Sequence, residues 1–136
     1  MKGIIWIRIA VVYFVCAVIF GMIIGISQQF QLATVHAHAN LLGWVSLALS
    51  GIIYHLFPQA GASALGKWHF WLHNIGLPVM LVGLYVEVLE LASLPLIQIG
   101  GTLAILGIIL FMLNVFVHVK ADAVSSNRSS ERSLDQ

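Results

Sequence analysis

The chain has 136 residues, of which 60% are hydrophobic and 8% are charged, and its formal net charge is +1. A soluble domain carries about a quarter charged residues, so this composition excludes an ordinary soluble protein and indicates one that crosses a membrane several times. The small net charge gives no basic surface for nucleic acid. Cys16 is the single cysteine, which excludes an intrachain disulfide, and we expect it to be a small buried side chain.

Four apolar stretches are long enough to cross a bilayer, which requires about 20 residues. They cover residues 4–26, 33–57, 68–91 and 94–119. The first is followed by a poor cleavage site, so we interpret it as a retained span rather than a signal peptide. The connections are short, including a turn rich in proline and small residues over residues 58–67, so neighbouring spans are expected to run antiparallel. The sequence therefore predicts an all-α, up-and-down four-helix membrane bundle over residues 1–119, followed by a disordered cytoplasmic tail over residues 120–136.

The basic residues predict the orientation of the bundle. In a four-span arrangement all of them fall on one side of the membrane, and the loops on the other side contain none. Loops rich in lysine and arginine remain in the cytoplasm. We therefore expect an integral protein of a bacterial inner membrane with both termini in the cytoplasm. The residues concerned are Lys2, Arg8, Lys67, Lys120, Arg128 and Arg132.

The second span opens with His36-Ala37-His38 near the outer face. At about 100° per residue the two imidazoles project roughly 200° apart, so one helix could provide a ligand to each of two neighbouring sites. Ionisable side chains within a span are candidates for function, and neutral imidazole binds haem iron, zinc or copper. Two interfacial histidines bonded to carbonyls or water are the simpler interpretation.

Haem is the ligand that this pair favours. No further thiolate or carboxylate stands beside the pair at the spacing of a zinc site, whereas haem needs only two axial ligands and apolar walls. The sequence contains no Cys-x-x-Cys-His attachment motif, so the cofactor would be noncovalent haem b. Gly43 lies two turns from His36 on the same helix face, where a small residue could admit a flat ligand.

A second group of histidines lies near the inner face. His69 and His73, at positions i and i+4, share a helix face and could chelate a metal. Trp68 and Trp71 lie beside them, which is typical of an interfacial aromatic belt. We favour the belt over a second haem or metal site. The other histidines of this group are His55 and His118.

The run H-A-H-A-N-L-L-G-W resembles the haem-ligand helices of haem–copper oxidase subunit I and its nitric oxide reductase relatives. In that superfamily one helix carries a His-x-His whose two histidines serve different haems. The resemblance implies that His36 and His38 ligate haem iron, and that Asn40, Gly43 and Trp44 belong to the same cofactor site. The copper helix of the oxidases has no counterpart in this sequence, so we expect no independent oxygen-reducing activity.

The resemblance also implies an assembly. The oxidase subunit has twelve spans in three arcs of four, which three copies of this chain would rebuild. His36 of one subunit and His38 of its neighbour would then hold one haem, and this favours a homotrimer over a dimer. We thus expect a membrane b-type haem protein for electron transfer or haem handling. The alternatives are a metal-ion transport or handling protein that uses the histidine clusters, and a non-catalytic assembly subunit of a respiratory complex.

Overall fold

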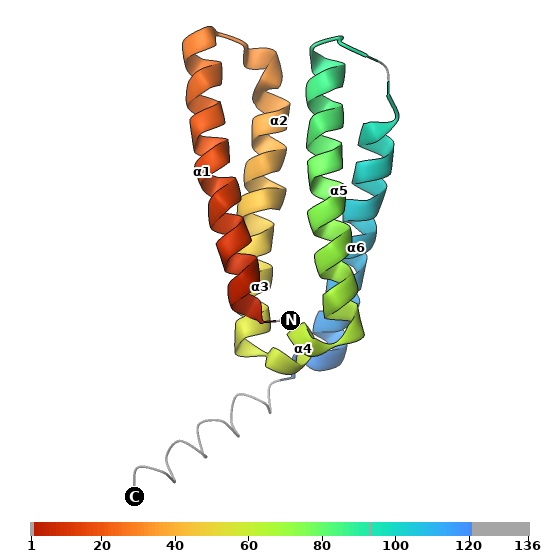
Figure 1. Cartoon of the computed structure of the whole chain (residues 1–136). Coiled ribbons are helices and arrows are strands. Elements are labelled where there is room, and N and C mark those ends of the chain that lie inside the picture. The colour runs from red at the N-terminus through yellow and green to blue at the C-terminus, as the bar shows by residue number, and fades with distance from the viewer. Residues whose placement is uncertain (1, 93, 121–136) are drawn as a thin grey trace, which may run out of the picture.

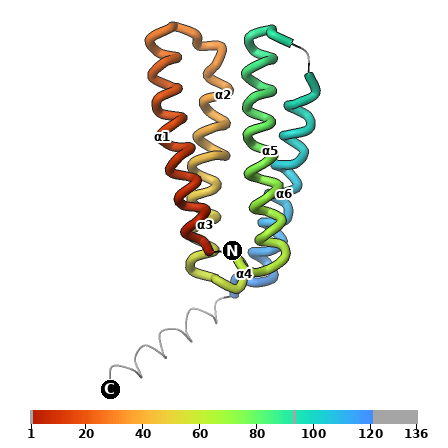
Figure 2. The backbone as a smooth tube through the Cα atoms, viewed as in Figure 1, coloured from red at the N-terminus to blue at the C-terminus, as the bar shows by residue number. Residues whose placement is uncertain are grey.

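The computed structural model describes residues 2–92 and 94–120, which form four long helical rods running up and down side by side (Figure 1). The backbone trace shows two hairpins, one from α1 to α3 and one from α5 to α6, joined through α4 at the end where the N-terminus lies (Figure 2). The expected tail covers residues 120–136, and all of it except Lys120 lies outside the described residues. The elements are α1 (Gly3–Ser27), η1 (Phe30–Leu32), α2 (Ala33–His38), η2 (Ala39–Ser46), α3 (Leu47–Leu56), α4 (Pro58–Ala62), α5 (Ala64–Val88) and α6 (Leu96–His118).

The predicted all-helical membrane architecture is confirmed. Within the described residues, four helical segments are long and apolar enough to cross a membrane: Gly3–Ser27, Phe30–Leu56, Ala64–Val88 and Leu96–His118. Large apolar side chains on the outward faces, such as Val12, Met22 and Phe116, are exposed. In a bilayer these faces contact lipid, so their exposure agrees with membrane insertion.

The third span begins at Ala64, earlier than residue 68 where the sequence analysis placed it. The Ser63 hydroxyl accepts a hydrogen bond from the Gly66 backbone N–H at 3.0 Å and so caps the helix. The preceding connection, expected to be a turn, contains the short helix α4, whose first residue is Pro58. Proline is favoured there because the first helical N–H has no intrahelical partner.

The second rod is not a regular α-helix, because η2 is a π-helical segment of eight residues. Its wider winding uses i→i+5 hydrogen bonds. Side chains bond to carbonyls in and beside this segment. The Ser46 hydroxyl donates to the Leu41 carbonyl at 2.8 Å, and His73 Nε2 of α5 donates to the Leu42 carbonyl at 3.0 Å. The π-helical segment is thus held both by its own serine and by the neighbouring hairpin.

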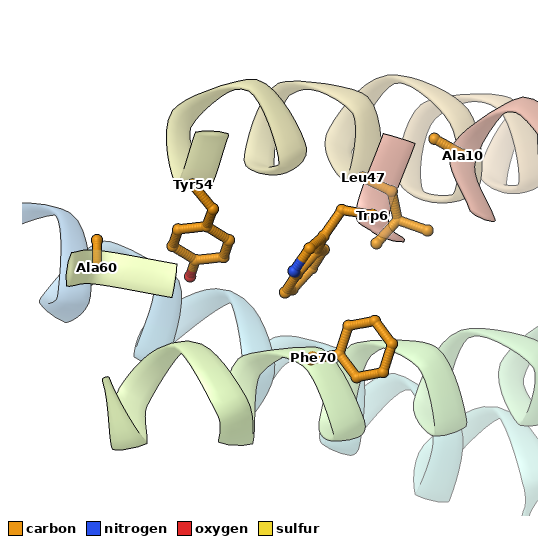
Figure 3. Close-up of a cluster of buried hydrophobic side chains, with 6 residues drawn as sticks. All are labelled: Trp6, Ala10, Leu47, Tyr54, Ala60 and Phe70. Carbon is orange, nitrogen blue, oxygen red and sulfur yellow. The ribbon is translucent and has the colours of Figure 1, made fainter. Parts of the chain in front are cut away.

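The core at the inner end joins the two hairpins around Trp6, which is fully buried. Figure 3 shows the Trp6 indole of α1 between Tyr54 of α3 and Phe70 of α5. Its ring centroid lies 5.1 Å from that of Tyr54 and 5.0 Å from that of Phe70. A smaller cluster of Ile24, Leu32 and Val35 packs against leucines of α5 near the outer end. The hairpins therefore meet at both ends of the bundle.

A buried polar network reinforces the inner end. Asn114 of α6 is fully buried, and its amide donates to the Tyr54 hydroxyl at 3.2 Å and to the Ala60 carbonyl at 2.9 Å. Its amide oxygen accepts from the Ser63 hydroxyl at 2.9 Å. One asparagine thus links α3, α4, the start of α5 and α6, and it satisfies polar groups that would be costly to leave unpaired in a membrane.

Candidate functional site

His36 lies between the two helices of the first hairpin. Its Nδ1 is 3.0 Å from the carbonyl oxygen of Ala17 in α1. A carbonyl only accepts hydrogen bonds, so Nδ1 carries the proton and donates, and Nε2 keeps its lone pair. Gly21 provides the space for the ring, since a Cβ there would lie 2.5 Å from His36 Cε1. The ring is therefore oriented by α1.

His38 has the same protonation pattern with a different partner. Its Nδ1 donates to the Thr34 carbonyl of its own helix at 2.8 Å. Among the residues that the structure describes, its Nε2 has no hydrogen-bond partner. His36 thus turns towards α1, whereas His38 turns back along α2, so the two rings leave the helix in different directions. This agrees with the divergence expected from helical geometry.

The other three predicted site residues also lie along the first hairpin. The Asn40 side-chain nitrogen donates to the His36 carbonyl at 3.0 Å and lies 3.3 Å from His36 Nε2. Trp44 stacks on Phe14 of α1 with ring centroids 4.8 Å apart. The space beside Gly43 is filled by the Tyr13 ring, because a Cβ at Gly43 would lie 2.5 Å from Tyr13 Cδ1. Gly43 therefore admits a side chain of α1 in this structure, and its place in a cofactor site stays a prediction.

An outer groove of about 420 Å³ runs beside this cluster, between α1, α2 and α5. Ala17, whose carbonyl orients His36, forms part of its wall, as do Val35 of α2 and Ala39, the first residue of the π-helical segment. Cys16 also lines the groove and is exposed, so the expectation of a buried cysteine is wrong. A thiol on the apolar outer side of α1 needs no burial, because it behaves as a small hydrophobic group.

His69 and His73 are each only 1% exposed, so the interpretation that they belong to an interfacial belt is wrong. Their i, i+4 spacing places both rings on the inward face of α5. His69 Nδ1 lies 2.9 Å from the Tyr54 hydroxyl, and the two imidazole centroids are 5.6 Å apart. The neighbouring tryptophans, Trp68 and Trp71, are exposed and do fit a belt.

The structure does not bring the four inner histidines together. His55 is exposed beside Lys2 and Pro58, and His118 ends α6. In residues 2–92 and 94–120, no three side chains of the histidine, cysteine or acidic types cluster as a metal site would require. The sequence analysis missed the Tyr54–Asn114–Ser63 network. An asparagine within the predominantly apolar last span was the available signal.

Comparison with known proteins gives one partial similarity. The chain is 37% identical over 58 residues to the Cbb3-type cytochrome c oxidase subunit CcoN1 of Stutzerimonas stutzeri. The match covers 38% of this chain and 12% of that protein, so the chain spans a small part of its relative's length. No family model and no solved structure matches the chain. The similarity supports a distant relation between this chain and that oxidase subunit. Together with the four apolar helices, it supports an integral membrane protein.

Gly21→Ala is expected to displace the His36 ring, because the added methyl group would lie only 2.5 Å from Cε1. Overpacking of this kind costs about 1–3 kcal/mol. The imidazole ¹⁵N spectrum of histidine-labelled protein measures the effect, since the Nδ1–H bonded to Ala17 gives a distinct signal. Gly25→Ala is the matched control one turn along α1, where a Cβ would have no neighbour within 4 Å. An unchanged His36 signal in both variants would contradict this packing.

Proposed function

We propose that the chain is a membrane cytochrome that binds haem b noncovalently through His36 and His38, for electron transfer or haem handling. The observation that carries the proposal is the shared bonding of the two imidazoles. Each donates its Nδ1–H to a backbone carbonyl, of Ala17 or of Thr34, which leaves Nε2 as the lone-pair nitrogen. Histidines that ligate metals are oriented in this way, because the second hydrogen bond fixes the tautomer and the ring direction.

The residues present fit such a cofactor. His38 Nε2 has no partner among the described residues, and the amide of Asn40 is the group that faces His36 Nε2. The adjacent groove of about 420 Å³ has aromatic and aliphatic walls that include Phe20, Leu81 and Tyr85. Its volume lies within the usual range of about 300–1,000 Å³ for ligand sites. A bound haem would supply one-electron chemistry, and the chain would orient it and exclude water.

The direction of the two rings supports the sharing of each haem between subunits. His36 is held against α1 by Ala17, whereas His38 turns along its own helix. Within one chain the two nitrogens do not face one another, so a six-coordinate iron would take its second ligand from another copy. We therefore propose a homo-oligomer, with a trimer favoured over a dimer.

We further propose that both termini lie in the cytoplasm of a bacterial inner membrane. Lys2 lines a surface pocket together with Ala62 of α4. At the same end, Gln59 of α4 donates a hydrogen bond to the His118 carbonyl at the end of α6. Lys120 follows two residues after His118, so Lys2 and Lys120 lie at the same end of the bundle. The positive-inside bias favours a cytoplasmic position for that end.

The absorption spectrum of the purified protein tests the haem proposal. We expect a Soret band, and sharp α and β bands on reduction, with one haem b per subunit. Light scattering after size exclusion should give the mass of an oligomer. A protein without a Soret band after expression with ample haem contradicts haem binding. A monomer that carries six-coordinate haem contradicts only the sharing of ligands.

A further inference from the structure

We infer that a second cavity, between α3, α5 and α6, binds the head group of a membrane-dissolved hydroquinone. The cavity measures about 280 Å³ and lies on the inner side of the π-helical segment. It is distinct from the groove beside His36, because none of its lining residues belongs to α1 or α2. Its walls are formed by Ser46, Leu49, Ser50, Ile53, His69, His73, Ile108 and Phe111.

One imidazole in the cavity wall has an unpartnered nitrogen. His73 lines the cavity and is 1% exposed. Its Nε2 donates to the Leu42 carbonyl at 3.0 Å, so Nε2 carries the proton and Nδ1 has a bare lone pair. Among the described residues that Nδ1 is buried without a hydrogen-bond partner. Leaving such an atom unpaired costs about 1–3 kcal/mol, so a ligand that donates a hydrogen bond to it would be favoured.

His69, the other imidazole in the wall, has the opposite hydrogen-bonding polarity. The Asn114 amide donates to the Tyr54 hydroxyl. The Tyr54 hydroxyl in turn donates to His69 Nδ1, with 2.9 Å between the oxygen and the nitrogen. His69 therefore carries its proton on Nε2, as a donor. The two imidazoles line the same cavity with ring centroids 5.6 Å apart, so an acceptor and a donor lie close together in its wall. A hydroxyl both donates and accepts, as this pair requires.

The other lining residues of the cavity indicate the chemistry of the rest of the ligand. No aspartate, glutamate, lysine or arginine is among the residues lining the cavity, so a charged ligand would have no counter-ion there. Phe111 lies beside His69 with ring centroids 5.0 Å apart, which provides an aromatic wall for a flat ring. Leu49 and Ile108 at the rim are exposed on the lipid-facing surface. The ligand is therefore a neutral hydroxylated ring that arrives through the bilayer.

The cavity has the size of the head group of a hydroquinone and not of the whole molecule with its tail. A volume of about 280 Å³ falls just below the range of about 300–1,000 Å³ typical of drug-sized ligands, so it accommodates one substituted ring. A hydrocarbon tail would leave past Leu49 and Ile108 into lipid. Hydroquinones of this form carry electrons within membranes, and the link between that role and this chain rests on the proposed function. Binding itself does not depend on haem.

The test is calorimetric titration of the full-length protein in lipid nanodiscs with decylubiquinol. We expect saturable binding to the wild type. His73→Phe removes the acceptor and should weaken binding about tenfold or more. Because that variant also loses the bond to Leu42, Ile108→Phe provides a second one, which narrows the rim without touching either imidazole. Ile109→Phe is the matched control, since Ile109 is exposed and does not line the cavity.

The outcomes separate this inference from the haem proposal. Saturable binding that is weakened by His73→Phe and Ile108→Phe and retained by Ile109→Phe supports the site. Any one of three results overturns it: partition without saturation, equal affinity in all variants, or equal binding of the dimethyl ether of decylubiquinol. Partition without saturation would mean that water alone fills the cavity. Haem content is measured on the same samples. Absent binding with intact haem bands overturns this inference alone, and intact binding without haem overturns the proposed function alone.

Discussion

Replacing His38 by alanine is expected to abolish the low-spin haem spectrum. The described residues leave His38 Nε2 without a protein partner, so this nitrogen is the one most available to iron. Loss of outer-sphere partners already lowers metal affinity about 10–100-fold, and loss of a ligand itself should lower haem retention at least as much. His36→Ala should have the same effect. The measurement is the reduced-minus-oxidised difference spectrum together with haem content per chain.

The control for these variants is His55→Ala. His55 is exposed and lies at the far end of the second rod, 19 positions after His36. At 1.5 Å per residue of a regular helix that is about 28 Å away, so its removal should leave the bands unchanged. Unaltered spectra in both His36→Ala and His38→Ala, with loss in a variant of the inner histidines, would move the haem to the other end of the bundle.

Gly100→Ala is expected to destabilise the bundle by about 1–3 kcal/mol, because the added methyl group would overpack the interface between α5 and α6. A Cβ at Gly100 would meet the backbone nitrogen of Met80, and it would lie 2.6 Å from the Gly76 carbonyl oxygen. Backbone atoms cannot rotate away as a side chain can, so the two helices must separate. Reversible unfolding in mixed detergent micelles measures the change in the free energy of unfolding.

The neighbouring glycine provides the control for this packing. A Cβ at Gly101 would come no closer than 3.7 Å to Met80 Sδ, which is an ordinary van der Waals distance. Gly101→Ala should therefore leave stability within about 0.5 kcal/mol of the wild type. Equal unfolding free energies for the two alanine variants would show that α5 and α6 do not approach as closely as the structure describes.

The spans were predictable from the sequence because length and apolarity alone decide which segments cross a bilayer. Each observed span boundary lies within four residues of its predicted position. The largest shift, at the start of α5, comes from the Ser63 cap. That cap was not recognised, because the Pro58–Ala62 stretch before it was interpreted as a turn rather than as a helix.

The candidate site was only partly predictable. The divergence of His36 and His38 follows from helical geometry and agrees with the structure. The carbonyl partner of His36 could not be predicted, because Ala17 lies in another helix and a backbone acceptor leaves no mark in the sequence. Gly43 was interpreted as space for a ligand, because the sequence does not show that Tyr13 fills that space.

The buried pair His69 and His73 shows the limit of composition as a guide. Their position at the start of a span, beside two tryptophans, is typical of an interface. Whether a histidine at such a position turns outward or inward depends on what the neighbouring helices offer. Here Tyr54 and the Leu42 carbonyl provide hydrogen bonds in the interior, and these offset the cost of burying imidazole.

The π-helical stretch Ala39–Ser46 determines the direction in which His36 and His38 point around the helix axis, relative to the side chains of α3. A π-helical turn is wider than an α-helical one by about one residue. If these residues wound as a regular α-helix instead, the segment before them would rotate by about 100° about its axis. Leu47 would stay seated on Trp6, while His36 would swing off α1. The bundle would thus persist with its imidazoles facing the wrong way. The π-helical winding therefore determines the orientation of the outer end of the second rod.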